Sequence, residues 1–407
     1  MSKISYITGL DLGSTKTCAL ICQLGEDDKL EVRGFGVSES KGWRRGLIVN
    51  MDSAVLSVKK AVEAAEESSG ISIDNVYAGF GGPHVSGANS RGALTLGKSA
   101  ENMREVKTED VRKVFQIAQG VSLPQDRKLV YAERQEYLLD SQNGIRNPVG
   151  MVGSRLEVNV HLVLGSVAAH ENIVTAVNRA GIVVNDTVFE ALAAAESCLT
   201  ADERELGVAL VDVGGGSSHL ICYQEGSIRH SAALRIGGEH FTNDLAVGLL
   251  TPIPEAEKIK MEWGRRDPSQ SGGPAVEVPS VGDRPARMID YNKLNEIIEP
   301  RAMELLELVQ TELSRSGSER QLGAGVVFTG GGAKLGGLMA LAERTLELPA
   351  RLSQPGGVEK LGENLLDPVF ATVTGLVIHG YRLRHLQSVR ETSLTGKLLG
   401  IFRSKGD

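Results

Sequence analysis

The feature that most constrains this chain is a short motif that occurs twice, about half the chain apart. The first copy spans residues 11–16 (DLGSTK) and the second spans residues 212–217 (DVGGGS). In each copy an aspartate ends an apolar, strand-like segment and a tight glycine turn follows it. One Asp-x-Gly at a strand end is usually only a turn. Two copies at this separation predict two lobes, each opening with a β-hairpin that has a polar tip.

The chemistry of the two tips points to phosphate binding. Glycine turns let backbone N–H groups converge on phosphate oxygens, and a pair of carboxylates can hold hydrated Mg²⁺ on a nucleotide. The expected metal-holding residues are Asp11 and Asp212. The expected phosphate-binding residues are Gly13, Ser14, Thr15, Lys16, Gly214, Gly215, Gly216 and Ser217.

A third glycine-rich segment, residues 326–337, reads as a buried strand that runs through glycines into a helix at 338–347. Such a loop lets a flat base lie against the backbone. The spacing of Gly330, Gly332 and Gly336 also resembles a dinucleotide fingerprint. The run lies in the last quarter of the chain, where too little sequence follows to complete a doubly wound sheet, and this argues against a dehydrogenase.

Residues 92–99 match the Walker A pattern formally. A P-loop needs a buried strand before its first glycine and a helix at its Lys-Ser pair. Here the polar segment 86–91 precedes the glycine, and residues 93–96 themselves look like a strand. We interpret the match as coincidental.

Composition limits the class of protein. The 407 residues predict several subdomains, and 41% hydrophobic with 23% charged residues is ordinary for a globular protein. No apolar run approaches the roughly 20 residues that span a bilayer, so we expect a cytoplasmic protein. The net charge of −7 gives nucleic acid no overall attraction, and it is not expected as a partner. Four cysteines without CxxC spacing predict buried thiols: Cys18, Cys22, Cys198 and Cys222.

The pattern of elements predicts an α/β chain interrupted by an α+β insertion. A helix is expected after Asp52 as its N-cap and before Gly70, and another over residues 108–119. Residues 265–287, rich in Pro, Gly and Ser, predict a mobile surface insertion rather than a structured element. The expected divisions are a first-lobe core at 1–82 and 166–199, the insertion at 83–165, a second-lobe core at 200–245, its outer part at 246–323, the second-lobe core and return to the first lobe at 324–385, a linker at 386–395 and a tail at 396–407.

Two phosphate hairpins followed by a glycine-rich adenosine strand resemble the superfamily of actin, heat-shock chaperone ATPases and sugar kinases. Within it, the insertion resembles that of the bacterial cell-division family FtsA, through Asp140, residues 144–145, residues 147–151, Gly153 and residues 155–161. The resemblance implies an actin-like two-lobed ATPase fold with ribonuclease H-like lobes and an FtsA-type inserted subdomain. It implies ATP or ADP with Mg²⁺ as cofactors.

Carried over residue by residue, the resemblance gives further roles. Asp11 and Asp212 would position Mg²⁺ through water molecules, and Glu190 would lie near the attacking water; these three are the expected catalytic residues. The adenosine would be held by Glu257, Lys260, Gly330, Gly331, Gly332 and Lys334. The spacing of Glu257 and Lys260 puts both on one helix face, although an exposed charged helix would show the same pattern.

The tail resembles the family's membrane-targeting helix. Apolar residues fall on one helix face and basic residues stand beside them, a pattern typical of helices that lie on anionic membranes. The residues expected at the membrane are Lys397, Leu398, Leu399, Ile401, Phe402 and Arg403. Gly400 costs about 1 kcal/mol of helix propensity, so one copy should bind weakly and a polymer avidly. A frayed terminus is the alternative interpretation.

The resemblance therefore implies a cell-division protein that polymerises and tethers FtsZ filaments to the cytoplasmic face of the inner membrane at the division site. The implied partners are FtsZ, other copies of the chain, other divisome proteins and anionic lipids. Any ATPase activity should be weak. The alternatives on the same fold are a phosphotransferase or chaperone-type ATPase, and a pilus-assembly adaptor.

Overall fold

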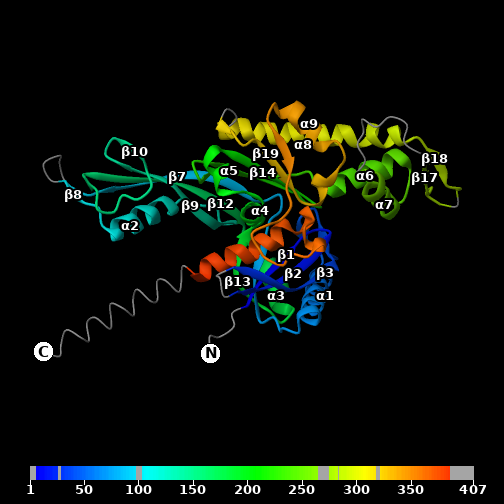
Figure 1. The fold of residues 1–407 in the computed structure, drawn as a ribbon, viewed down its shortest axis with the longest axis horizontal. Coiled ribbons are helices and arrows are strands. Elements are labelled where there is room, and N and C mark those ends of the chain that lie inside the picture. The colour runs from blue at the N-terminus through cyan, green and yellow to red at the C-terminus, as the bar shows by residue number, and fades with distance from the viewer. Residues whose placement is uncertain are drawn as a thin grey trace.

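The structure is a computed structural model that describes residues 6–25, 29–97, 103–264, 275–282, 284–317 and 321–385. The molecule is elongated, with the inserted subdomain at one end and the ribbon of β17 (Val276–Val278) and β18 (Arg287–Ile289) at the other (Figure 1). Within the described residues, none of the helices is long and apolar enough to cross a membrane.

The first lobe is built on a five-stranded sheet in the order β13-β6-β1-β2-β3. Its strands are β1 (Tyr6–Leu12), β2 (Lys16–Leu24), β3 (Leu30–Glu39), β6 (Asn75–Phe80) and β13 (Val183–Phe189). Both faces of β2 are buried: Ala19 and Ile21 join the core beneath α1 (Met51–Ser69), whereas Leu20 joins a second core beneath the helix 371–385. Helices α1 and α3 (Val167–Arg179) therefore cover one face of the sheet and helix 371–385 covers the other (Figure 1).

The N-cap of helix α1 lies two residues earlier than the sequence predicts. Asn50 is the N-cap, because its side chain accepts a hydrogen bond from the Ser53 N–H, and the prediction of Asp52 is wrong. Both residue types are good caps, and the chain geometry selects Asn50. Gly70 ends the helix as predicted, in the left-handed conformation at φ 69°.

A nine-stranded sheet joins the insertion to the second lobe, in the order β10-β9-β12-β7-β16-β15-β14-β19-β20. The insertion supplies β7 (Ser86–Thr95), β9 (Arg127–Leu139), β10 (Gln142–Ile145) and β12 (Arg155–Ser166), with α2 (Thr108–Gln119) packed on β7 and β12. The second lobe supplies β14 (Val208–Val213), β15 (Ser218–Gln224), β16 (Ser227–Leu234), β19 (Val326–Thr329) and β20 (Ala350–Leu352). The two parts meet where Ser86 of β7 pairs with Ala232 of β16.

Helix α2 has the bounds that the sequence predicts. Residues 92–95 of the Walker A match lie within β7, in agreement with its interpretation as coincidence, and Lys98 and Ser99 lie outside the described residues.

The second lobe carries helices α6 (Gly238–Leu249), α7 (Ile253–Trp263), α8 (Tyr291–Ser316) and α9 (Leu338–Leu346). Beside them β17 (Val276–Val278) pairs with β18 (Arg287–Ile289). The prediction that 265–287 holds no structured element is therefore wrong for its second part. Val276 and Val278 are buried against the core of α8, and three residues are too few to show a hydrophobic period.

The remaining elements are short. They are β4 (Trp43–Arg44) with β5 (Leu47–Ile48), β8 (Arg104–Glu105) with β11 (Val152–Gly153), α4 (Glu190–Cys198), α5 (Ala201–Leu206), and the 3₁₀ turns Gly331–Lys334, Glu363–Leu365 and Pro368–Phe370. Helix α4 connects the first lobe to the second and carries Glu190 as its first residue.

Candidate functional site

A cavity of about 610 Å³ lies between the two lobes. Its volume is in the range of ligand sites. Every predicted catalytic, metal and nucleotide residue within the described part of the chain lines it: Asp11, Gly13, Ser14, Thr15, Lys16, Glu190, Asp212, Gly214, Gly215, Gly216, Ser217, Glu257, Lys260, Gly330, Gly331, Gly332 and Lys334. The structure thus brings together residues that are more than 300 positions apart in the sequence.

The tips of the two hairpins touch across the boundary between the lobes. A Cβ atom at Gly215 would lie 2.6 Å from Thr15 Cγ2, and one at Gly216 would lie 2.6 Å from Ser14 Oγ. Larger residues at either position would push the tips apart. The glycines of the second hairpin are therefore needed for this close approach as well as for the turn.

Lys16 lies beside the first aspartate. Its Nζ is 2.7 Å from Asp11 Oδ2. Burial alone would lower the pKa of Lys16, but the charge of Asp11 and its hydrogen bond outweigh that effect and the pKa is raised. Lys16 is therefore a partly buried, charged donor at the cavity, suited to contact phosphate oxygens.

Asp212 ends β14 on the opposite side. Its Oδ2 accepts a hydrogen bond from the Thr372 hydroxyl at 3.1 Å, at the start of helix 371–385. Burial and the neighbouring charge of Asp11 raise the pKa of Asp212 from its ordinary 3.8 to about 6. Gly330, at φ 83°, lies so close that a Cβ there would be 2.3 Å from Asp212 Oδ1. The glycine loop that begins at Gly330 therefore packs directly against the Asp212 carboxylate.

The acidic groups fit a magnesium–nucleotide complex better than an ion held by protein alone. Asp11 and Asp212 offer hard carboxylate oxygens. Burial and the charge of Asp11 raise the pKa of Asp212, and a cation bound between them would favour its ionised form. Within the described ranges, no group of three or more His, Cys, Asp or Glu side chains could hold a metal ion. Mg²⁺ usually takes one or two carboxylates and completes its shell with water and phosphate oxygens.

Glu190 lies at the far end of the cavity under the backbone of Gly81. A Cβ at Gly81 would lie 2.0 Å from Glu190 Oε2, so only glycine leaves room for this carboxyl group. Burial, then the charges of Asp11 and Asp212, raise the pKa of Glu190 well above its ordinary value. The carboxyl group lines the same cavity as the two aspartates.

His219, which no sequence pattern indicated, contacts the Glu190 carboxyl group through its imidazole ring. Its Nε2 accepts the Gly82 N–H at 2.9 Å, which leaves the ring proton on Nδ1, 3.4 Å from Glu190 Oε2. Burial lowers the pKa of His219 to about 4, so the ring is neutral near pH 7. The only sequence signal was a polar residue at an inward position of a buried strand.

At the other end of the cavity, Glu257 and Lys260 lie on one face of α7, as their spacing predicts. Lys260 Nζ is 2.7 Å from Glu257 Oε2 and donates to the Gly238 carbonyl oxygen at 3.0 Å. This pairing fixes α7 against the start of α6. Lys334 forms an ion pair with Asp367. Both lysines are thus already paired, and their side chains form the wall of the cavity.

The β4–β5 hairpin also reaches the cavity, and no sequence pattern indicated it. Trp43 and Gly46 line the cavity, and the Gly46 N–H donates to Ser14 Oγ at 3.0 Å. The indole N–H of Trp43 is buried without a partner in the described part of the chain. The hairpin therefore closes the first lobe's side of the cavity over the hairpin tips. The predicted membrane residues, 397–403, lie outside the described residues.

Comparison with protein families gives two matches. The family described as "Cell division protein FtsA" matches residues 209–375, and "SHS2 domain inserted in FTSA" matches residues 82–164. The cell division protein FtsA of Pseudomonas aeruginosa is 41% identical, with 92% of this chain and 89% of that protein covered. FtsA of Borreliella burgdorferi is 34% identical over 98% of this chain and 97% of that protein, and FtsA of Escherichia coli K12 is 36% identical over 92% and 90%.

Solved structures share the fold. The PilM–PilN type IV pilus biogenesis complex matches with a TM-score of 0.64 at 17% identity, covering 92% of this chain and 98% of that chain. MreB5 of Spiroplasma citri bound to ADP matches with a TM-score of 0.54 at 13% identity, covering 92% and 95%. The predicted actin-like two-lobed fold with an inserted α+β subdomain is confirmed.

Proposed function

The chain belongs to the family of the cell division protein FtsA, and from this premise we propose that it binds ATP with Mg²⁺ in the cavity between its lobes. The observation that carries the proposal is the contact of two glycine hairpin tips, one from each lobe, beside a partly buried lysine and two buried aspartates. Phosphates placed there would meet backbone N–H groups from both sides. MreB5, which shares the fold, is described as bound to ADP, in agreement with this assignment.

Asp11 and Asp212 would hold Mg²⁺ through its water shell. When bound, Mg²⁺ would neutralise phosphate charge and fix the position of the last phosphate. Lys16 would contact the phosphates, Gly330–Gly332 would lie against the adenine, and α7 would close the adenosine end. Lys16 remains charged because Asp11 is beside it, so the cavity keeps one cation even before a metal binds.

Glu190 would orient a water molecule toward the last phosphate, with His219 keeping its carboxyl group turned into the cavity. Hydrolysis by this arrangement should be slow, because each described lysine that lines the cavity is paired with a carboxylate: Lys16 with Asp11, Lys260 with Glu257 and Lys334 with Asp367. An added arginine or second metal usually supplies much of the acceleration. Bound nucleotide would then act mainly by holding the two lobes together.

We further propose the role of an adaptor that assembles into filaments and tethers FtsZ filaments to the cytoplasmic face of the inner membrane at the division site. The support is the family, the inserted subdomain and the amphipathic pattern of residues 397–403. A single short tail binds weakly, and assembly multiplies its effect. Other divisome proteins and anionic lipids complete the proposed partners.

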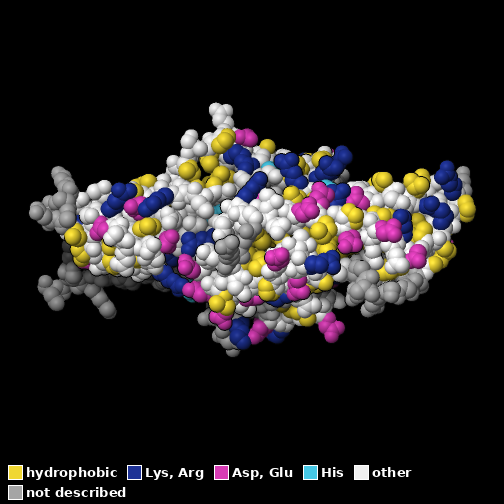
Figure 2. All heavy atoms as spheres, turned by 90° about the horizontal axis from the view of Figure 1, so that it is seen from above, with side chains coloured by type: hydrophobic (Ala, Val, Ile, Leu, Met, Phe, Trp, Pro, Cys, Tyr) yellow, Lys and Arg dark blue, Asp and Glu magenta, His cyan; other side chains and the backbone are white. Residues whose placement is uncertain are grey.

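An exposed apolar surface on the second lobe is a suitable place for a partner protein. Val247 (74% exposed), Leu250, Ile253, Val281 and Met288 stand out from the end of α6, the start of α7 and the β17–β18 ribbon. The Val281 N–H donates to the Leu250 carbonyl oxygen, which joins these segments into one surface. Apolar side chains are visible at this end of the molecule, among basic and acidic ones (Figure 2). Contiguous exposed apolar side chains commonly mark protein interfaces.

Liposome flotation tests the proposal. The full chain and a chain ending at Leu386 are mixed with vesicles containing anionic lipid, with ATP and Mg²⁺ or without, and the floated samples are viewed by electron microscopy. We expect the full chain to float and form filaments only with nucleotide, and the shortened chain to stay at the bottom. Failure of both chains to float, together with sugar-dependent ATP turnover, would instead indicate a kinase on this fold.

A further inference from the structure

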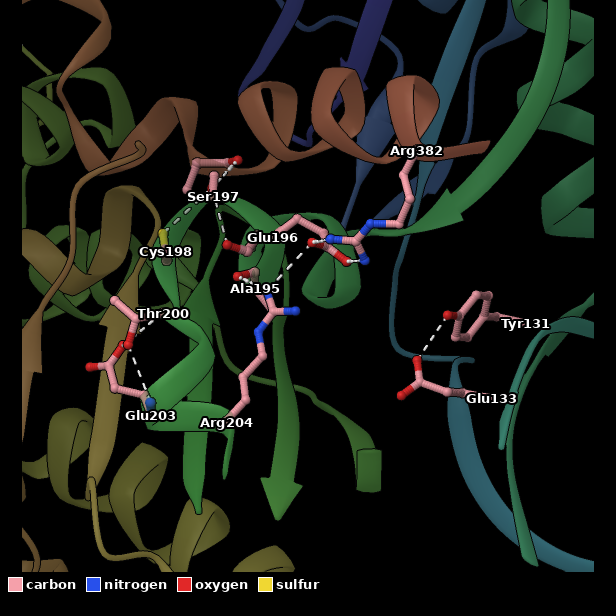
Figure 3. Close-up of polar contacts among 12 residues, drawn as sticks. Tyr131, Glu133, Ala195, Glu196, Ser197, Cys198, Thr200, Glu203, Arg204 and Arg382 are labelled. Carbon is pink, nitrogen blue, oxygen red and sulfur yellow. Dashed lines mark hydrogen bonds and ion pairs between the residues drawn. The ribbon is translucent and has the colours of Figure 1, made fainter. Parts of the chain in front are cut away.

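A second cavity, of about 510 Å³, lies between the inserted subdomain and the core of the molecule. It shares no lining residue with the cavity between the lobes. Figure 3 shows its walls: Glu196 of α4, Arg204 of α5 and Arg382 of helix 371–385 on one side, and Glu133 of β9 on the other, with open space between them. Its volume is within the usual range for small ligands.

The core wall carries an excess of positive charge. Glu196, whose side chain is 3% exposed, accepts hydrogen bonds from Arg382 with both oxygens, at 2.6 and 2.5 Å. The same carboxylate lies 3.5 Å from Arg204 Nη2, which also donates to the Ala195 carbonyl oxygen at 2.7 Å. One carboxylate therefore pairs with two guanidinium groups, which leaves this wall with one positive charge in excess.

Two buried donors at this wall have no partner. The Tyr223 hydroxyl and the Arg204 Nε–H are buried and accept or donate no hydrogen bond in the described part of the chain. Tyr223 is only 2% exposed, and the Arg204 guanidinium carbon lies 5.0 Å over the centre of its ring, so both donors belong to one site. Burial raises the pKa of Tyr223, so its hydroxyl keeps the proton, and arginine can only donate. Both groups therefore lack a hydrogen-bond acceptor, and native proteins rarely leave buried donors without one.

The opposite wall combines an apolar surface with two arginines at the opening. Val111 and Phe115 of α2 and Tyr137 of β9 supply the apolar part. The Arg134 guanidinium lies 5.3 Å over the Tyr137 ring. Arg112 is exposed at the cavity and makes no ion pair or hydrogen bond with the described residues. A ligand with an apolar part would pack on this wall while its charge met the arginines.

The charges favour an anion. Four arginines and two glutamates line the cavity: Arg112, Arg134, Arg204, Arg382, Glu133 and Glu196. Burial raises the pKa of Glu133, which weakens its repulsion of an anion, and its Oε2 already accepts the Tyr131 hydroxyl at 2.9 Å. The cavity is thus positive overall, and its two donors without a partner, the Tyr223 hydroxyl and Arg204 Nε, lie on the wall formed by the core.

We propose that this cavity binds a carboxylate carried on an apolar group. The carboxylate accepts hydrogen bonds from Arg204 Nε and the Tyr223 hydroxyl, and the apolar group packs on Phe115 and Tyr137. Two sources share this chemistry: a free organic acid, and the C-terminal carboxylate of a peptide. The proposal is independent of nucleotide binding in the other cavity.

The test is a ligand-observed NMR titration of the full chain. The probes are phenylacetate with phenylacetamide as its neutral counterpart, and a short peptide ending in leucine with a free or amidated C-terminus. We expect each acid to bind more tightly than its amide. Binding by phenylacetate indicates a free acid as a sufficient ligand, and binding by the free peptide alone indicates a peptide. Equal binding of acids and amides, or no binding at millimolar concentration, would overturn the proposal.

Variants place the binding. Tyr223→Phe removes a donor that has no partner, so it should leave folding stability unchanged or higher while it weakens acid binding about tenfold. Arg112→Ala should weaken binding severalfold, whereas Arg344→Ala, an exposed arginine on α9, should have no effect. Lys16→Ala should leave acid binding intact, because Lys16 lies in the other cavity. Unchanged binding by Tyr223→Phe, or loss of binding in Lys16→Ala, would contradict this location.

Discussion

The buried carboxyl group of Asp212 should destabilise the nucleotide-free protein at neutral pH. Its pKa is about 6 in the folded chain against an ordinary 3.8. Below pH 3.8 the carboxyl group is protonated in both the folded and the unfolded chain, and its burial as an acid costs the fold no ionisation energy. As the pH rises through 6 the unfolded chain ionises more readily than the folded one, so the free energy of unfolding falls. The difference of about 2 pKa units corresponds to about 3 kcal/mol, which is a large share of the stability of an ordinary domain.

The substitution Asp212→Asn removes the charge and keeps an oxygen for the Thr372 hydroxyl. Without nucleotide, the variant should unfold at higher denaturant than the parent at pH 7.5, by up to about 3 kcal/mol, and the two should converge near pH 4. With ATP and Mg²⁺ at 100 times the parent's Kd, the difference should shrink to less than about 1 kcal/mol, because the parent gains about 2.7 kcal/mol and the variant, which binds about a hundredfold more weakly, gains only about 0.4 kcal/mol.

Urea unfolding followed by circular dichroism from pH 4 to 8 measures both differences. Burial of neutral His219, whose pKa is about 4, lowers stability as the pH falls below 6.5, but it does so equally in both proteins. It therefore cancels in the comparison. If the variant is less stable than the parent at every pH without nucleotide, the buried charge of Asp212 does not lower folding stability and the reasoning is wrong.

Three further substitutions test separate parts of the account. Gly81→Ala should displace the Glu190 carboxyl group, because the new Cβ would lie 2.0 Å from Oε2. In a phosphate-release assay, ATP turnover should fall at least tenfold, which corresponds to about 1.4 kcal/mol in the activation barrier. The control is Gly362→Ala, where a Cβ meets open space, and it should leave turnover unchanged. His219→Gln should lower turnover without changing ATP affinity, since the ring contacts Glu190 and not the nucleotide; equal losses in both would contradict a positioning role. Val247→Glu, on a side chain that is 74% exposed, should alter folding stability by less than about 0.5 kcal/mol yet weaken co-sedimentation with FtsZ, and unchanged co-sedimentation would place the partner contact elsewhere.

The local parts of the architecture were predictable from sequence. Each hairpin is a contiguous strand–turn–strand pattern, and α2 has two acidic residues in its first turn and ends at Gly120. The convergence of Asp11 and Asp212 in one cavity also followed from repetition of the motif, because two copies imply two equivalent lobes. Local patterning decides such features, and no distant contact overrides it.

Features that depend on distant contacts were not predictable. The pairing of Ser86 with Ala232, which joins the insertion to the second lobe, leaves no periodic trace in either strand. The β4–β5 hairpin has strands of two residues, too short for any period, so the place of Trp43 in the cavity was unforeseen. His219 follows a phosphate turn in a strand that reads as core, and its contact with Glu190 depends on how two lobes pack.

The most direct measurement is ATP affinity by isothermal titration calorimetry, with Mg²⁺ and with EDTA, for the full chain and for single substitutions in each lobe. The account predicts Mg²⁺-dependent binding that Asp11→Asn and Asp212→Asn each weaken by about a hundredfold, the effect of removing an interaction worth about 3 kcal/mol from either side. Binding that survives substitution in one lobe, or no binding at all, would show that the two hairpins do not share a nucleotide.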